Sequence, residues 1–218
     1  PFLADKYLLE LEKTTRTDFI YFVSSSYFWR FGEKEQFKSY VDLDMEEAKK
    51  KPYQFIHLSL IEHLRKKLPQ SSKLTLYPFS LKKGANIYGI IFGASHPRAV
   101  EKFLSIAWKR NETNGYANFD IDEDQKKNQL DLFEGKKLTK KESFQQRLRE
   151  KVLDGSISDN FTAFNFALNE AHIGAHAAEE LKKMKKEGLI DYHGMSPLVT
   201  YENVYKSPRI LRFKLLKK

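Results

Sequence analysis

The hydrophobic pattern is most regular between residues 160 and 190, where apolar side chains recur at steps of three and four. A first helix is predicted from Thr162 to Ala171, with one apolar face made by Phe161, Phe164, Ala167 and Leu168. A second helix is predicted from Ala175 to Glu187, with an inner face made by Ala177, Ala178, Leu181, Met184 and Gly188. The turn His172–Gly174 separates them, and Gly188 ends the second helix because glycine enters the left-handed cap conformation cheaply.

The segments before and after this helix pair complete the order of elements of a known fold. A helix is predicted before the pair, from Lys141 to Leu153, with inward side chains Phe144, Leu148 and Val152. After the pair, the stretch 189–193 alternates like a short strand, and a second strand is predicted from Arg209 to Leu215 beyond a loop. This order is typical of a winged helix-turn-helix, which presents one helix to a DNA groove. A rigid protein-docking module is the alternative use of the same fold.

The N-terminal half predicts a mixed α/β domain. A helix is expected at Ala4–Lys13, and the apolar run Asp18–Ser25 predicts a strand buried on both faces, as in a parallel α/β sheet. The stretches 73–81 and 86–94 are joined by a short loop, so they should pair antiparallel. A helix that opens near Pro97 buries Val100, Phe103, Leu104, Ala107 and Trp108.

Charge is concentrated in the C-terminal part. Residues 136–218 hold 17 Lys and Arg against 10 Asp and Glu, a net charge of +7, whereas residues 1–135 hold 21 against 19, a net charge of +2. An excess of positive charge beside a helix-turn-helix favours an anionic partner, and we favour DNA over RNA. The same net charge also serves solubility.

The candidate nucleic-acid contacts are basic residues on the outer face of the second helix and on the wing. The full set is His176, Lys182, Lys183, Lys186, Lys206, Arg209 and Arg212. Glu179 and Glu180 lie among the lysines of the outer face, and Glu179 should repel phosphate, which predicts a modest affinity or a contact centred elsewhere. The affinity for nucleic acid that such phosphate contacts provide should fall as the salt concentration rises.

The residues give little support for a metal site or a catalytic site. His57 and His63 are six apart on a predicted helix, and the acidic run Asp120–Asp124 lacks the glycine of a calcium loop, so no metal site is expected. The serines at 24–26 lack a nucleophile pattern, and no catalytic residue is identified. The sequence has no cysteine, which fits a reducing cytoplasm, and no apolar run is long enough to span a membrane.

With these segments identified, the chain resembles the bacterial three-Cys-motif partner (TcmP) family. The likeness rests on IYGIIFGASHPRAVEKFLSIAWKRNETNGYANFDID, at Ile87–Asp122, and on the winged segment after it. The resemblance implies that residues 1–112 are the C-terminal half of a methyltransferase-like, Rossmann-like domain, 113–140 an acidic loop and linker, and 141–218 the winged domain. It also implies that the strand at 86–94 lies between the other two strands, as in methyltransferases. Family members carry an Asp-Pro-Phe-Gly stretch after the fourth strand; here Pro1-Phe2 is followed by Leu3.

The resemblance also sets the expected partners. The glycine-rich cofactor loop of a methyltransferase does not occur here, so no cofactor site is expected, and S-adenosylmethionine would bind only with an upstream half. The strand at 18–25 should therefore need a cover at its edge, from that half or from another chain. The resemblance implies a radical-SAM-like partner with three cysteines and an accessory role in a mobile-element or defence system. A nucleic-acid methyltransferase whose catalytic half lies upstream is the alternative.

Overall fold

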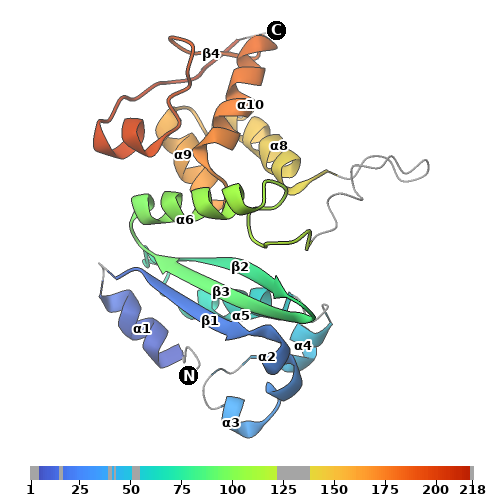
Figure 1. Cartoon of the computed structure of the whole chain (residues 1–218). Coiled ribbons are helices and arrows are strands. Elements are labelled where there is room, and N and C mark those ends of the chain that lie inside the picture. Colours follow the sequence, from blue (N-terminus) through green and yellow to red (C-terminus); the bar gives the residue numbers. More distant parts are fainter. Residues whose placement is uncertain are drawn as a thin grey trace, which may run out of the picture. The chain divides into compact units, whose positions relative to one another are not determined.

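The computed structural model describes residues 5–14, 17–38, 41, 43–50, 55–121 and 138–216 (Figure 1). Contacts divide the chain into two units: Pro1–Phe103 with Tyr116–Ile121, and Leu104–Gly115 with Asp122–Lys218. Helix α6 (Pro97–Arg110) passes from the first unit to the second. The linker expected at 113–140 lies largely outside the described residues, as does most of the acidic run, so the expected domain limits stay a prediction.

A three-stranded antiparallel sheet organises the first unit. Its strands are β1 (Phe19–Ser24), β2 (Thr75–Lys83) and β3 (Asn86–Ala94), in the order β1-β3-β2. The turn between β2 and β3 uses Gly84, whose φ of 59° a side chain would strain. The central position of β3 and its antiparallel pairing with β2 confirm the strand order predicted from the sequence.

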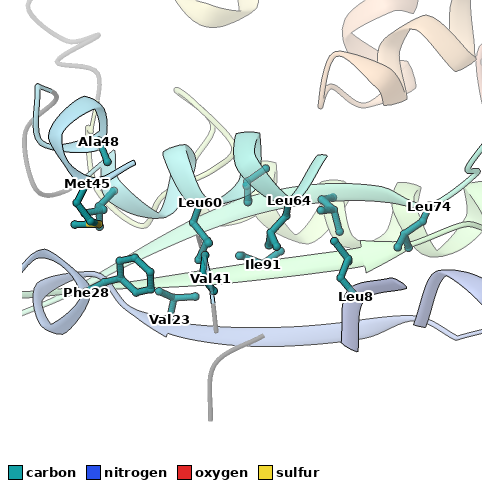
Figure 2. Close-up of a cluster of buried hydrophobic side chains, with 13 residues drawn as sticks. Leu8, Val23, Phe28, Val41, Met45, Ala48, Leu60, Leu64, Leu74 and Ile91 are labelled. Atoms are coloured by element: carbon teal, nitrogen blue, oxygen red, sulfur yellow. The ribbon is translucent and has the colours of Figure 1, made fainter. Parts of the chain in front are cut away.

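Four of the described helices share one core with this sheet: α1 (Asp5–Lys13), α2 (Ser25–Phe31), α4 (Met45–Lys49) and α5 (Ile56–Lys67). No described side chain of the short helix between them, α3 (Glu35–Lys38), belongs to that core cluster. Figure 2 shows Leu60 and Leu64 of α5 facing Ile91 and Val23 of the sheet, with Leu8 of α1 beside them. Apolar side chains at helical spacing on α5 therefore build the core of this unit.

The prediction that β1 is buried on both faces is wrong. Ile20 and Phe22 are 70 % and 56 % exposed, whereas Val23 is buried against the helices. On the exposed face, Phe22 stacks on Tyr88 of β3 with ring centroids 5.3 Å apart. A continuous apolar run does not distinguish burial on two faces from burial on one face with apolar residues left on the other.

The two edges of the sheet also differ. Beside β2, the backbone N–H of Ser80 donates to the Tyr116 carbonyl (2.7 Å) and the N–H of Asn118 donates to the Ser80 carbonyl (2.9 Å). These bonds cover the β2 edge with residues 116–121. Among the described residues, no strand pairs with the outer edge of β1.

The second unit contains three packed helices. They are α8 (Lys140–Leu153), α9 (Asn160–Asn169) and α10 (Gly174–Lys186). The predicted contacts of Leu181 and Met184 are consistent with the burial found, because both are fully buried together with Phe164 and Leu148. Phe161 is an exception to its predicted apolar face: it is 44 % exposed, with its ring centroid 5.5 Å from that of Tyr205.

The turn between α9 and α10 is tightly specified. The N–H of His172 donates to the Ala167 carbonyl (2.7 Å) and the N–H of Ala171 donates to the Leu168 carbonyl (3.0 Å), which together make a Schellman motif. Ala171 holds the left-handed position with φ of 58°. Gly174 follows at the start of α10, where an added Cβ would lie 2.2 Å from the Val199 carbonyl oxygen. The turn angle thus depends on a close backbone approach that only glycine permits.

A two-stranded ribbon follows the helices. Strand β4 (Ile190–Asp191) pairs antiparallel with β5 (Lys214–Leu215), and a further bridge joins Asp159 to Arg212. The second strand is shorter than the predicted 209–215. A π-helical turn, η2 (Glu202–Lys206), lies before it, where the sequence predicts a loop.

Candidate nucleic-acid interface

Three lysines on one side of α10 form the most exposed basic cluster predicted from the sequence. Lys182, Lys183 and Lys186 are all exposed, and Lys186 lies four residues after Lys182 and three after Lys183, so the three share a helix face. No described residue forms an ion pair with any of the three. Their charge is therefore available to an external anion. We call Lys182, Lys183 and Lys186 the lysine face.

Basic residues of α8 form ion pairs with the acidic residues of α10 and of its C-terminus. Lys141 pairs with Glu179 (Nζ–Oε2 2.6 Å), and Arg149 pairs with both Glu180 and Glu187 (2.6 Å each). The Glu180 side chain is only 4 % exposed, so the Arg149 contact is what satisfies it. The predicted repulsion of phosphate by Glu179 is reduced accordingly, because a cation already lies against that carboxylate.

The placement of His176 on the outer face is wrong. Its side chain is 9 % exposed, and its ring meets that of Trp108 edge-on with centroids 4.4 Å apart. Its Nδ1 lies 3.0 Å from Nδ1 of the fully buried His172. Burial, with the nearby Lys141 charge, lowers the pKa of His176 to about 4. A neutral, buried histidine cannot supply charge to the lysine face.

The error has a physical origin that also applies to Glu180. The His176 ring lies beside Trp108 of α6 and His172 of the preceding turn, whereas Glu180 lies against Arg149 of α8. Because both side chains are polar, the sequence predicts them on the outer face, but each has a polar partner inside the unit: His172 for His176 and Arg149 for Glu180. Arg149 was not singled out from the sequence. The available signal is that α8 presents Lys141 and Arg149 eight residues apart, close to two helical turns, so that both fall on one flank.

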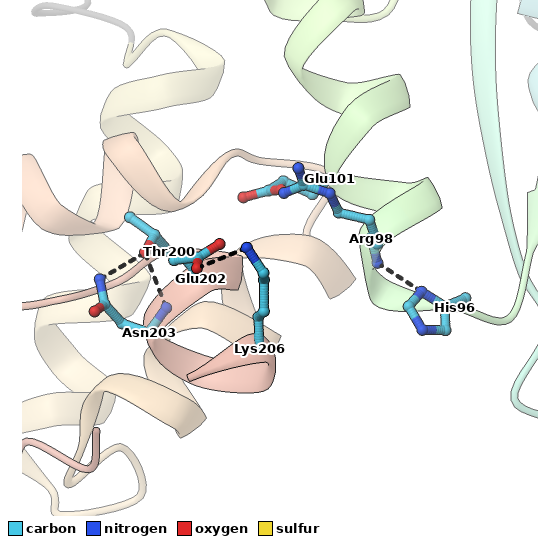
Figure 3. A network of polar contacts seen from close by, with 7 residues as sticks. All are labelled: His96, Arg98, Glu101, Thr200, Glu202, Asn203 and Lys206. Carbon is cyan, nitrogen blue, oxygen red and sulfur yellow. Dashed lines mark hydrogen bonds and ion pairs between the residues drawn. The ribbon is translucent and has the colours of Figure 1, made fainter. Parts of the chain in front are cut away.

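The segment that returns toward β5 carries the remaining predicted contacts. Leu211 and Phe213 are buried and Arg212 is exposed, so apolar and basic positions alternate along this segment. Arg209 is exposed as well, and neither arginine pairs with a described carboxylate. Lys206 differs, because its Nζ lies 3.1 Å from Oε1 of Glu202 within η2 (Figure 3). Both partners are well exposed, so this pair is weak and solvent-screened.

Asn160, at the first position of α9, holds this return segment in place. Its side-chain amide donates to the carbonyls of Leu198 (3.2 Å) and Arg209 (2.9 Å) and accepts from the Leu211 N–H (2.8 Å). The side chain is 1 % exposed, so all three bonds lie away from water. Arg209 and Arg212 are thereby fixed relative to the helix pair.

A buried polar pair, Ser80 and His57, lies within the described residues of the first unit. In the first unit, the Ser80 hydroxyl lies 2.5 Å from Nε2 of His57, but both residues are fully buried, out of reach of a substrate. Within the described ranges, no three His, Cys, Asp or Glu side chains cluster as a metal ion would need. No helix in that part of the chain has the length and apolar character to cross a membrane.

Comparison with known proteins agrees with the geometry. No curated protein and no solved structure matches the chain significantly. Residues 118–197 match the family model described as the GMT-like wHTH domain, a stretch that contains α8, α9, α10 and β4 and ends before η2 and β5. The chain therefore carries a winged helix-turn-helix domain in its second unit.

Proposed function

We propose that the winged helix-turn-helix binds nucleic acid, duplex DNA in preference to RNA, through the lysine face. The observation that carries this proposal is the segregation of charge on α10. Its acidic residues are matched by Lys141 and Arg149 of α8, while Lys182, Lys183 and Lys186 have no described ion-pair partner. In helix-turn-helix proteins the second helix of the motif is the one that enters the major groove.

The side chains on α10 favour backbone contacts over base reading. Sequence is read in the major groove mainly by Arg, Lys, Asn and Gln near the start of the recognition helix. Here the exposed positions of the first turns are Ala175 and Glu179. The lysines follow in the last two turns and suit phosphates. We therefore expect low sequence specificity, with Arg209 and Arg212 adding phosphate contacts from the return segment.

Fluorescence anisotropy with labelled duplex and single-stranded oligonucleotides tests this proposal. The double substitution Lys183→Ala with Lys186→Ala should weaken binding at low salt by about tenfold or more, and equally for unrelated sequences. Lys66→Ala with Lys67→Ala, in the exposed last turn of α5, is the matched control and should bind like wild type. Absence of binding by the wild-type protein at low salt would leave the protein-docking reading in place.

For the whole chain, we propose a TcmP-like accessory protein of a mobile-element or defence system. The resemblance at Ile87–Asp122 supports this, and the order β1-β3-β2 supports a methyltransferase-like origin for the first unit. A nucleic-acid methyltransferase remains the alternative that this strand order favours. Co-expression with a three-cysteine radical-SAM-like protein tests the accessory role, because a stable complex should co-purify through gel filtration.

We also propose that another strand covers the outer edge of β1. One edge of the sheet is covered by residues 116–121, whereas β1 presents an apolar sequence and exposes Ile20 and Phe22. An open apolar strand edge pairs readily with other chains. Sedimentation velocity tests this, because we expect concentration-dependent association when the chain is purified alone. A monodisperse monomer at high concentration would count against it.

A further inference from the structure

A pocket of about 400 Å³ lies in the second unit beside the first turn of α10. Its walls come from the C-terminal half of α6, the start of α8 and the residues that open α10. A volume of this size falls within the range of small-molecule sites and exceeds what a bare inorganic anion would fill. The pocket is separate from the lysine face, none of whose residues line it.

One part of the lining suits an anion. Lys109 is exposed and forms no ion pair with any described residue, and Lys141 stands nearby. His176 also lines the pocket; because its Nδ1 is engaged by His172, the ring edge that bears Nε2 is left for a ligand. No hydrogen bond to a described residue occupies that nitrogen, and the side chain is nine-tenths buried.

The first turn of α10 adds to this electrostatic character. Ile173 is its N-cap residue and lines the pocket, and it supplies no side-chain acceptor for the backbone N–H groups of the turn. Those groups and the helix dipole favour negative charge at this end of the helix. Burial is the largest cause of the low pKa of His176, and the positive charges of Lys141 and Lys140 lower this pKa further.

The rest of the lining suits an organic group attached to the anion. Trp108 is buried below the pocket with its indole Nε1 donating to the Ala171 carbonyl (2.9 Å), so it forms a rigid floor. Ile173 contributes apolar surface. Ser105 and Glu112 contribute a hydroxyl and a carboxylate, and the carboxylate accepts hydrogen bonds from hydroxyl groups while it disfavours a phosphate placed beside it.

We propose that this pocket binds a ribose phosphate group, with the phosphate at Lys109 and His176 and the sugar hydroxyls toward Glu112. The group comes either from a free nucleotide or from the phosphorylated end of a nucleic-acid strand. The proposal does not depend on groove binding by the lysine face, and either can fail without the other.

Trp108 offers a direct readout, because the chain has only two tryptophans. In a Trp29→Phe background, AMP and ribose 5-phosphate should change Trp108 fluorescence saturably, while adenosine and inorganic phosphate should bind about tenfold more weakly or worse. Lys109→Gln should weaken AMP binding about tenfold, because it removes a charged contact to the phosphate. Lys183→Ala with Lys186→Ala should leave AMP binding unchanged.

A second readout keeps the test independent of the Trp29 substitution. In the unsubstituted protein, saturating AMP should raise the pKa of His176, because an adjacent phosphate stabilises the imidazolium. Ring-nitrogen NMR measures this pKa. Competition by a 5′-phosphorylated oligonucleotide would assign the group to a strand end, and AMP binding without competition would assign it to a free nucleotide. Unsaturable signals in both readouts, or inorganic phosphate binding as tightly as AMP, would overturn the proposal.

Discussion

The buried histidine pair at the turn of the helix-turn-helix should make the second unit sensitive to acid. His172 stacks on Phe144 with ring centroids 4.1 Å apart, and no described residue bonds its Nε2. Burial lowers the pKa of His172 to about 2, with the charges of Lys140, His176, Arg147 and Lys141 acting in the same direction. For His176, burial and the two lysines lower the pKa to about 4, although Glu179 opposes them.

The direction of the effect follows from proton binding. Both pKa values are lower in the folded protein than the ordinary 6.5, so between pH 6.5 and pH 4 the unfolded chain binds more protons than the folded one. Stability is therefore lost as the pH falls through this window. Each histidine accounts for up to about 1.4 kcal/mol per pH unit. From pH 7 to pH 5 the pair should cost roughly 4 kcal/mol in the free energy of unfolding.

Urea unfolding of the Trp29→Phe protein at pH 7, 6 and 5, followed by Trp108 fluorescence, measures this loss. Replacement of both His172 and His176 by asparagine removes the titrating groups and should flatten the pH dependence by about the same 4 kcal/mol, whatever it does to stability at pH 7. His193→Gln, at an exposed position, is the control and should keep the wild-type slope. A double variant that loses stability with acid as steeply as wild type would refute the reasoning.

Three further predictions concern packing and edges. Arg149→Ala should destabilise the second unit by about 3 kcal/mol in thermal or urea unfolding, because it strands the buried Glu180 carboxylate; no loss would contradict this. Ala171→Gly should stabilise it by up to about 1 kcal/mol, because φ is 58° there; destabilisation in urea would contradict this. Ile20→Ser with Phe22→Ser should reduce the association seen in sedimentation velocity, and unchanged association would move the interface elsewhere.

The elements that the sequence predicts well have one apolar face and a local end signal. The α8–α10 helices follow from spacing, and the C-terminus of α10 follows from Gly188, whose φ is 71°. The order β1-β3-β2 was inferred through the resemblance to methyltransferases, and the short turn at Gly84 fixed only the antiparallel pairing of β2 with β3.

The candidate site was predicted only in part, because polarity does not reveal pairing. Lys182, Lys183 and Lys186 are exposed as expected, but His176 and Glu180 are buried beside partners from distant positions. Such contacts depend on how α8 packs against α10, which single-residue polarity does not encode. The role of Asn160 is similarly hidden, since its three bonds reach residues about 40 to 50 positions away along the chain.

The salt dependence of DNA binding tests the central claim most directly. For wild type, the logarithm of the association constant should fall linearly with the logarithm of salt concentration, as counterions are released from the phosphates. Lys183→Ala with Lys186→Ala should lower that slope by roughly one to two, and Lys66→Ala with Lys67→Ala should leave it unchanged. A slope that the α10 variant shares with wild type would show that the lysine face does not contact DNA.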